Sequence, residues 1–382
     1  MDEQVPHKRR LLPQVRRVVL KVGSSILSNS RGINQDRLQR LVAEIDALLH
    51  RNYEVVLVSS GAVAAGLARL GLKTRPKTIP QKQAAAAVGQ IGLMALYEEY
   101  FAARGRHVAQ ILLTHDDLAS RRRYLNARHT FEALLDAGVV PVVNENDTVV
   151  VDEMRFNFGD NDNLSALAAV LVDADLLVIL SDVDGLHTTD PRVRPDARLV
   201  SLVPNVTAEI AGFVGGSSSA VGTGGMATKL NAAHKATEAG IPCVIADGLH
   251  PGVLAAVFDP TVSTGTLFLP AGDRLAKRKH WIAYTLKPAG AVIVDEGAYE
   301  AIVRKGRSLL PRGIVEVQGT FGAGDCVSCR NPKAEEFARG LVNYSAVELD
   351  KIKRLHSNAI ESALGYKVSD EVIHRNDLVV LT

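Results

Sequence analysis

A short, strongly polar segment of the chain lies at residues 158–166, FGDNDNLSA. It places two carboxylates and two carboxamides in a row, at Asp160, Asn161, Asp162 and Asn163, before an apolar run that predicts a buried helix. A helix start needs only one capping side chain, so four polar residues favour a further role. A carboxylate could hold facing lysines, and an asparagine could recognise an ammonium or a carboxylate. From the residues alone, capping and ligand binding both stay open.

Three common ligand signatures do not fit the chain. An EF-hand loop for calcium has acidic residues before its glycine and a glutamate after it, whereas here Gly159 comes first. The phosphate motif G-x-x-x-x-G-K-[ST] is absent. GTGGMA at 222–227 only half matches a dinucleotide fingerprint, and no apolar strand precedes it. The P-loop and Rossmann interpretations are therefore rejected.

Two lysines lie near glycines in positions that suit a phosphate. Lys21 ends the first apolar run just before Gly23, and Lys229 falls in the first turn of a helix predicted from about Met226. Glycines allow close backbone approach, and N–H groups at a helix start point toward an anion. Either lysine alone would be interpreted as a surface residue. Their joint placement favours a pair that brackets a transferring phosphoryl group.

The elements that must position these residues alternate between short β-branched runs and helical patterns. The predicted strands are 18–22, 55–58, 108–113, 139–143, 176–180 and 243–245. Near-continuous apolar strands separated by helices are typical of an α/β fold with a mainly parallel sheet sandwiched by helices. Ligands bind beyond the carboxyl ends of such strands, and four of these strands end in small or polar residues.

Changes of composition divide the chain of 382 residues. A stretch rich in Gly, Ser and Thr after Val203 predicts a mobile loop before the helix at Met226. A polar and basic stretch, AGDRLAKRKH, follows later. The remaining residues show strand-like pieces at 291–294, 314–317, 326–328 and 378–381 and a helical stretch at 298–305. We predict one domain over 1–270, a linker over 271–280 and a small, mainly β domain over 281–382.

The composition argues against several classes of protein. Lys and Arg number 44 against 42 Asp and Glu, so the net charge of +2 carries no whole-chain signal for nucleic acid. No segment has the apolar length of a signal peptide or a membrane span, which predicts a soluble, cytoplasmic protein without a membrane partner. Cys243, Cys326 and Cys329 are too few for a disulfide framework or a zinc site, and no metal-ligating residue is predicted.

Six motifs, in this order, resemble the amino acid kinase family. They are KVGSS, SSGAVAAG, NEND, FGDNDNLSA, SDVDGLHTTDPR and GTGGMATKL. The later stretch VDEGAYEAIVRKGRSLLPRGI resembles the PUA domain that follows the kinase domain in many bacterial members that phosphorylate glutamate. The resemblance covers nearly the whole chain and implies an amino acid kinase fold followed by a small, mainly β PUA-like domain.

The resemblance implies a role for individual residues. The catalytic residues would be Lys21, Lys229 and Asp162, with Asp162 orienting the two lysines. Glutamate would be bound by Ser60, Asp147, Asn161 and Asp160. The nucleotide would be bound by Lys21, Ser181, Asp182, Thr223, Gly224, Gly225, Met226, Ala227, Thr228 and Lys229.

The implied reaction uses ATP and Mg²⁺ to phosphorylate the side-chain carboxylate of L-glutamate, giving L-glutamate 5-phosphate, the first step of proline biosynthesis. A carboxylate is ionised at neutral pH and needs no general base. The lone histidines His115 and His187 are accordingly interpreted as surface or packing residues. The resemblance also implies feedback inhibition by proline and a homo-oligomer, expected to be a tetramer.

Two other interpretations stay open. The same fold could act on another small carboxylate, a carbamate or a phosphate, although the NEND and FGDND loops argue against this. A different class of function is RNA binding through the PUA-like tail. Basic residues gather there at 304–307, but few aromatic residues lie beside them to stack on bases.

Overall fold

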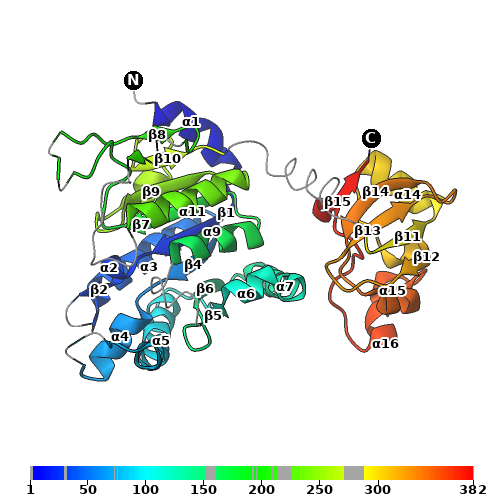
Figure 1. Cartoon of the computed structure of the whole chain (residues 1–382), viewed down its shortest axis with the longest axis horizontal. Coiled ribbons are helices and arrows are strands. Elements are labelled where there is room, and N and C mark those ends of the chain that lie inside the picture. Colours follow the sequence, from blue (N-terminus) through cyan, green and yellow to red (C-terminus); the bar gives the residue numbers. More distant parts are fainter. Residues whose placement is uncertain are drawn as a thin grey trace. The chain divides into compact units, whose positions relative to one another are not determined.

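The computed structural model describes residues 3–29, 32–72, 74, 76–150, 161–191, 193–194, 196–207, 210, 212–213, 225–270 and 288–381. Asp160, Thr223, Gly224, most of the predicted mobile loop and the predicted linker lie outside these ranges. The chain divides into two compact units, Met1–Leu118 with Thr130–Ala271 and Ala119–His129 with Gly272–Thr382 (Figure 1). The predicted domain boundaries near 270 and 281 stay a prediction.

An eight-stranded sheet lies at the centre of the first unit, in the order β5-β6-β4-β1-β7-β9-β10-β8. Its strands are β1 (Arg17–Val22), β4 (Glu54–Ser59), β5 (Val108–Leu113), β6 (Val140–Glu145), β7 (Leu176–Ser181), β8 (Leu202–Val203), β9 (Cys243–Asp247) and β10 (Thr266–Phe268). Only the pairing of β9 with β10 is antiparallel within this sheet of described residues. The predicted mainly parallel sheet is confirmed, and the short strands β8 and β10 were missed because two or three residues carry little pattern.

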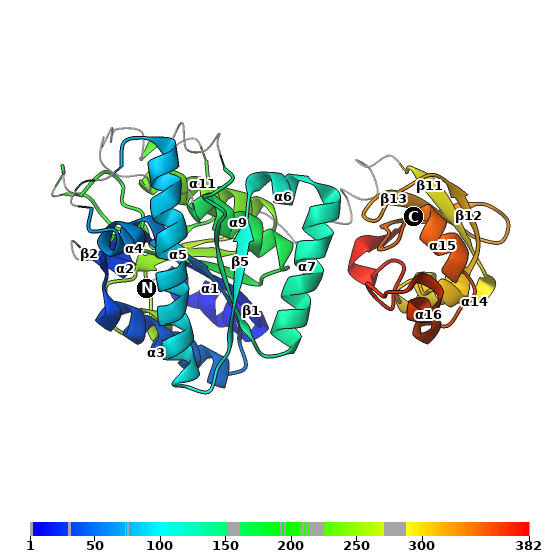
Figure 2. The same ribbon diagram turned by 90° about the horizontal axis from the view of Figure 1, so that it is seen from below.

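Helices cover both faces of this sheet. Before residue 270 the helices are α1 (Gln4–Leu11), η1 (Leu12–Gln14), α2 (Ser24–Leu27), α3 (Gln35–His50), α4 (Ala62–Arg69), α5 (Ile79–Ala102), α6 (His115–Ala119), α7 (Arg121–Asp136), α9 (Asn161–Leu171), α11 (Met226–Glu238) and α12 (Val253–Val257). A hairpin of β2 (Ser28–Asn29) and β3 (Gly32–Ile33) follows α2. The pair α9 and α11 packs on one face, and α3, α5 and α12 share the core on the other (Figures 1 and 2).

The alternation of side chains along β1 decides what reaches each face. Val18, Leu20 and Val22 belong to the apolar core that β1 shares with α3 and α5. Successive residues of a strand point to opposite faces, so Lys21 is directed to the other side, where α9 packs. A lysine in a mainly apolar strand is thereby placed under α9.

The second unit contains a five-stranded sheet in the order β12-β11-β13-β14-β15. Its elements are β11 (Gly290–Val294), α14 (Glu296–Lys305), η3 (Pro311–Gly313), β12 (Ile314–Gly319), β13 (Cys326–Arg330), β14 (Glu336–Leu341), α15 (Ala346–Ile352), η4 (Ser357–Ala359), α16 (Ile360–Leu364), η5 (Arg375–Asp377) and β15 (Leu378–Val380). It has its own apolar core, which includes Val292, Val327 and Tyr344. The predicted small, mainly β module is confirmed, whereas β14 was missed because Glu336 and Arg339 interrupt its apolar pattern.

None of the helices within the described ranges combines the length and the apolar character that crossing a bilayer requires.

Candidate active site

The carboxyl ends of neighbouring strands bring the predicted polar residues to one edge of the sheet. In β1, Lys21 pairs with Val58 of β4 and with Ile179 of β7. Val58 pairs in turn with Val143 of β6. The four strands are parallel and in register, so the residues that follow their carboxyl ends lie at the same edge of the sheet.

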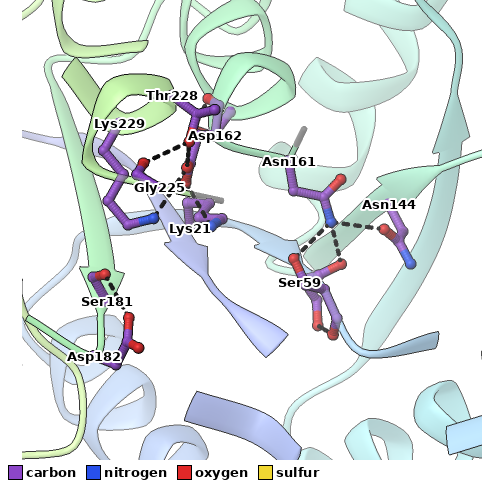
Figure 3. A network of polar contacts seen from close by, with 12 residues as sticks. Lys21, Ser59, Asn144, Asn161, Asp162, Ser181, Asp182, Gly225, Thr228 and Lys229 are labelled. Atoms are coloured by element: carbon purple, nitrogen blue, oxygen red, sulfur yellow. Dashed lines mark hydrogen bonds and ion pairs between the residues drawn. The ribbon is translucent and has the colours of Figure 1, made fainter. Parts of the chain in front are cut away.

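Asp162 lies between Lys21 and Lys229 (Figure 3). Its Oδ1 is 2.5 Å from Lys21 Nζ, and its Oδ2 is 3.2 Å from Lys229 Nζ. The Thr228 hydroxyl donates a hydrogen bond of 2.7 Å to the same Oδ2. The carboxylate is 2% exposed and each lysine side chain is 6% exposed. Neither lysine is therefore a solvated surface residue, which is how each would be interpreted if it were considered alone. We call Lys21, Asp162 and Lys229 the lysine-aspartate cluster.

The ionisation of Asp162 depends on its surroundings. Burial alone would raise the pKa of this carboxyl group, but Lys21, Lys229 and the bond from Thr228 outweigh burial and hold its pKa below the ordinary value. Asp162 is therefore ionised at neutral pH. Within the cluster, two ammonium groups face one carboxylate, which leaves an excess of positive charge suited to an anion.

Asn161, the first residue of α9, makes a second polar cluster. Its Nδ2 lies 3.2 Å from the Ser59 carbonyl oxygen, 2.8 Å from Ser60 Oγ and 3.0 Å from Asn144 Oδ1, and donates to these acceptors (Figure 3). Asn144 Nδ2 in turn donates a bond of 2.9 Å to Gln90 Oε1 on α5. Asn161 Oδ1 is buried and accepts no hydrogen bond from a described residue. A buried acceptor without a donor costs free energy that a ligand N–H could offset.

A cavity of about 420 Å³ lies beside this second cluster. Ser60, Asn161 and Asp147 line it, together with Gly61, the N-cap of α4, and residues 62–64 at the start of that helix. The first N–H groups of a helix have no partner within the helix, so the start of α4 suits a carboxylate. Gly61 has φ +110°, a left-handed conformation that glycine adopts without strain. The volume suits a small amino acid.

Asp147 lies in this cavity without a cation partner among the described residues. Burial raises the pKa of its carboxyl group to about 6. An incoming ammonium group would supply the missing partner and favour the ionised form. Asp147 therefore suits the amino group of an amino acid.

Ser181 and Asp182, two of the residues assigned to the nucleotide, lie on the side of the lysine-aspartate cluster away from Asn161 (Figure 3). Ser181 ends β7 and is buried, and its Oγ donates a bond of 3.2 Å to Asp182 Oδ1. Gly225 is the N-cap of α11, so Met226, Ala227, Thr228 and Lys229 form the first turn of that helix. The Thr228 hydroxyl also lies 2.8 Å from the Gly225 carbonyl oxygen. Free N–H groups at this helix start are suited to phosphate oxygens.

Within the described ranges, no group of three or more His, Cys, Asp and Glu side chains is arranged to hold a metal ion. Mg²⁺ commonly relies on one or two carboxylates and the phosphates of a nucleotide, so such a cage is not required. The exposed carboxylate of Asp182 could supply a protein contact to such a magnesium ion.

His187 Nε2 lies 2.8 Å from Asp184 Oδ1. The three cysteines are free and buried.

Sequence reasoning missed Gln90 and Asn144 as members of the site. Asn144 belongs to the NEND loop, which was recognised as polar, but no role was assigned to this residue. Gln90 is a buried polar residue on a helix rich in alanine and glycine. A polar side chain on the apolar side of a helix was the available signal.

Two family models match the chain. Residues 16–247 match the amino acid kinase family, and residues 290–364 match the PUA domain. The chain therefore belongs to the amino acid kinase family.

Curated relatives of similar length carry one name, glutamate 5-kinase. The protein from Citrifermentans bemidjiense is 53% identical over 98% of this chain and 100% of its own length. Those from Geobacter metallireducens and Moorella thermoacetica are 54% and 51% identical, over 97% and 98% of this chain and 99% and 98% of their own lengths. UMP kinase from Bacillus anthracis is a similar solved structure, with 18% identity, a TM-score of 0.47 and coverage of 68% of this chain and 97% of that one. The full-length matches place the chain among the glutamate 5-kinases, and they confirm the family resemblance seen in the motifs.

Proposed function

We propose that this chain transfers the γ-phosphoryl group of ATP to the side-chain carboxylate of L-glutamate, giving L-glutamate 5-phosphate in the first step of proline biosynthesis. The observation that carries the proposal is the buried lysine-aspartate cluster beside a cavity suited to an amino acid. The names of the full-length relatives support glutamate and ATP as the substrates.

The lysine-aspartate cluster supports phosphoryl transfer without an acid or a base. The attacking carboxylate of glutamate is already ionised, so no proton has to be removed from it. Lys21 comes from β1 and Lys229 from the start of α11, and the two ammonium groups would together neutralise charge on the transferring group. Asp162 keeps both ammonium groups in place, and its low pKa keeps it ionised for this purpose. Catalysis would rest on alignment and charge.

The cavity supports recognition of an amino acid. Asp147 and the buried Oδ1 of Asn161 would accept hydrogen bonds from the ammonium group of glutamate. Ser60 would donate or accept through its hydroxyl, and the start of α4 would receive a carboxylate. Asp160, which lies outside the described residues, would assist in holding glutamate.

ATP would lie against the end of β7 and the start of α11. Ser181 and Asp182 would contact the nucleotide, and the segment from Thr223 to Lys229 would bind its phosphates. Mg²⁺ bound to the phosphates would supply further neutralisation of their charge. Asp182, an exposed carboxylate directly after β7, would be in a position to contact it.

The decisive experiment is ADP release with glutamate, aspartate, N-acetylglutamate or no acceptor, with and without Mg²⁺. We expect Mg²⁺-dependent turnover on glutamate alone, and a fall in kcat of about 100-fold or more in Lys229→Met. Lys235→Met is the matched control, since Lys235 lies on the same helix but is exposed. Turnover on another acceptor in place of glutamate, or equal activity of both variants, would contradict the proposal.

Inhibition by proline and a homo-oligomer, a tetramer by resemblance, are further parts of the proposal. Proline should raise the KM for glutamate in the same ADP assay if it competes for the amino acid cavity. Light scattering of the purified chain measures the mass of the assembly, and the mass of a monomer would contradict the proposed tetramer.

A further inference from the structure

A second cavity, of about 720 Å³, lies in the second unit. It is formed by the start of α14, the loop that follows this helix and the segment before β15. None of the residues assigned to phosphoryl transfer lines it. Its charged and titratable lining residues are Asp295, Arg307, Arg312, Glu371, His374 and Arg375. We call it the arginine cavity.

The three arginines of this cavity are not paired within the described part of the chain. Arg307, Arg312 and Arg375 form no ion pair or side-chain hydrogen bond with a described residue. Other arginines of the same unit do pair, as Arg304 does with Glu300 and Arg339 with Glu336. A guanidinium group presents five donors in a planar fork that matches phosphate and carboxylate oxygens. Three such groups around one hollow create a place for an anion.

The two carboxylates of the lining do not cancel the positive charge of the three arginines. Asp295 caps α14 by accepting a 2.7 Å bond from the Ala298 N–H, and Glu371 accepts a 2.6 Å bond from the Ser369 hydroxyl. Both carboxylates are thus engaged locally, and three arginines still exceed them in charge.

His374 adds a hydrogen-bond donor to the lining. Its Nδ1 accepts a hydrogen bond of 3.2 Å from the Asn376 N–H. A neutral histidine whose Nδ1 accepts carries its hydrogen on Nε2. That nitrogen can therefore donate to a ligand oxygen.

We propose that the arginine cavity binds a compact polyanion, a small molecule with two or more phosphate or carboxylate charges. Its volume of about 720 Å³ is that of a small-molecule site. No Phe, Tyr or Trp is among the described residues that line it, so it offers no surface on which a nucleic-acid base would stack. The chemistry of the lining thus fits a small anion better than RNA.

Calorimetric titration of the full chain tests this site, with inorganic pyrophosphate and citrate as the phosphate and carboxylate probes. A non-hydrolysable ATP analogue and glutamate fill the kinase site beforehand. The test variant is Arg307→Gln/Arg312→Gln/Arg375→Gln. The control variant, Arg304→Gln/Lys305→Gln/Lys351→Gln, removes the same charge from exposed residues that do not line the cavity.

We expect at least one probe to bind the native and control chains alike, and the test variant at least about tenfold more weakly. Equal affinity for all three chains would overturn the proposal, because binding would then not depend on the three arginines. Equal weakening in the test and control variants would also overturn it, because net charge alone would then explain binding. No heat with either probe would also overturn it, as would retention of a short RNA that depends on the same arginines while neither probe binds. Equal melting temperatures verify folding, and Arg375→Gln alone replaces the triple variant if that unfolds.

Discussion

At the scale of single residues, the site combines groups that a folded chain tolerates only together. A buried carboxylate and two buried lysines would each be costly alone, because removing one charge of a buried pair leaves the other uncompensated. In this chain Asp162 satisfies Lys21 and Lys229 at once, and Thr228 adds a hydrogen bond. The same contacts that make burial tolerable hold the two ammonium groups beside the place proposed for the phosphoryl group.

The raised pKa of Asp147 predicts a dependence of glutamate use on pH. Since burial raises this pKa to about 6, the carboxylate becomes protonated as the pH falls through that value and can no longer pair with an ammonium group. We expect kcat/KM for glutamate to fall about tenfold per pH unit below 6, whereas kcat/KM for ATP at saturating glutamate should change less. A pH series from 5 to 8 measures both.

Asp147→Asn provides the control for this prediction. The variant should have a low kcat/KM for glutamate that no longer changes near pH 6. Its melting temperature at pH 7 should not fall, because the folded chain no longer buries a charge that burial disfavours. A step near pH 6 that persists in the variant would assign the titration to another group.

Gln90 is predicted to act on substrate binding through Asn144. Gln90→Met removes the oxygen that accepts the Asn144 Nδ2 hydrogen bond and leaves a buried donor unpaired, at a cost of about 1–3 kcal/mol. Asn144 would then reorient and release Asn161. We expect the KM for glutamate to rise roughly tenfold while kcat and the KM for ATP change less than about twofold.

Gln81→Met is the matched variant for Gln90, because Gln81 is exposed near the start of the same helix. It should leave all three kinetic constants near those of the native chain. Equal changes in the KM values of both substrates for Gln90→Met would indicate general damage to the fold.

At the scale of secondary-structure elements, the crossing of α4 and α5 shapes the amino acid cavity. The two helices approach so closely that a Cβ atom at Gly89 would lie 1.7 Å from the Ala62 carbonyl oxygen. Ala62 is the first residue of α4 and lines the cavity. Glycine at this crossing therefore places the start of α4 where it can meet a substrate, and α5 carries Gln90 next to the same crossing.

Gly89→Ala tests this crossing. The added methyl group meets backbone atoms that cannot rotate away, so we expect a loss of about 1–3 kcal/mol in the free energy of unfolding and a higher KM for glutamate. Gly92→Ala is the control on the same helix, since its Cβ would meet only the flexible side chain of Arg69. It should be neutral or slightly stabilising, because alanine favours helix interiors. Urea denaturation measures the free energy of unfolding of both variants, and equal values for Gly89→Ala and Gly92→Ala would contradict the close crossing of the two helices.

At the scale of the whole molecule, the two units have separate apolar cores. The first core joins β1, β4 and β7 to α3, α5 and α12, and the second surrounds residues of β11, β13 and α15. The residues proposed for catalysis all belong to the first unit, and the arginine cavity belongs to the second. Separate cores allow each unit to unfold as its own cooperative event.

Differential scanning calorimetry of the full chain is therefore predicted to show two transitions. An ATP analogue at about 100 times its dissociation constant, added together with glutamate, should stabilise the first unit by about 2.7 kcal/mol. Only the midpoint temperature of the first unit's transition should therefore rise. The second transition should stay in place. A single transition that moves as a whole would show that the two units unfold together.

The amino-acid sequence was enough to predict the class of fold, the six longer strands of the eight-stranded sheet and the order of the motifs. Six apolar runs that alternate with helical patterns predict a parallel sheet covered by helices on both faces. The carboxyl ends of its strands predict where the site lies. The residues alone favoured Lys21 and Lys229 as a pair, and the family resemblance added Asp162 between them; the structure places the three side chains in contact, and their catalytic role stays a proposal.

No pattern in the sequence predicted which polar residues form hydrogen bonds with one another. Gln90, Asn144 and Asn161 lie 54 and 17 positions apart along the chain, yet one series of hydrogen bonds joins them. The arginine cavity likewise combines Arg307 and Arg312 with Arg375, which lies close to the end of the chain. Spacing in a sequence reports the face of one helix or strand, whereas contacts between distant segments depend on packing and register.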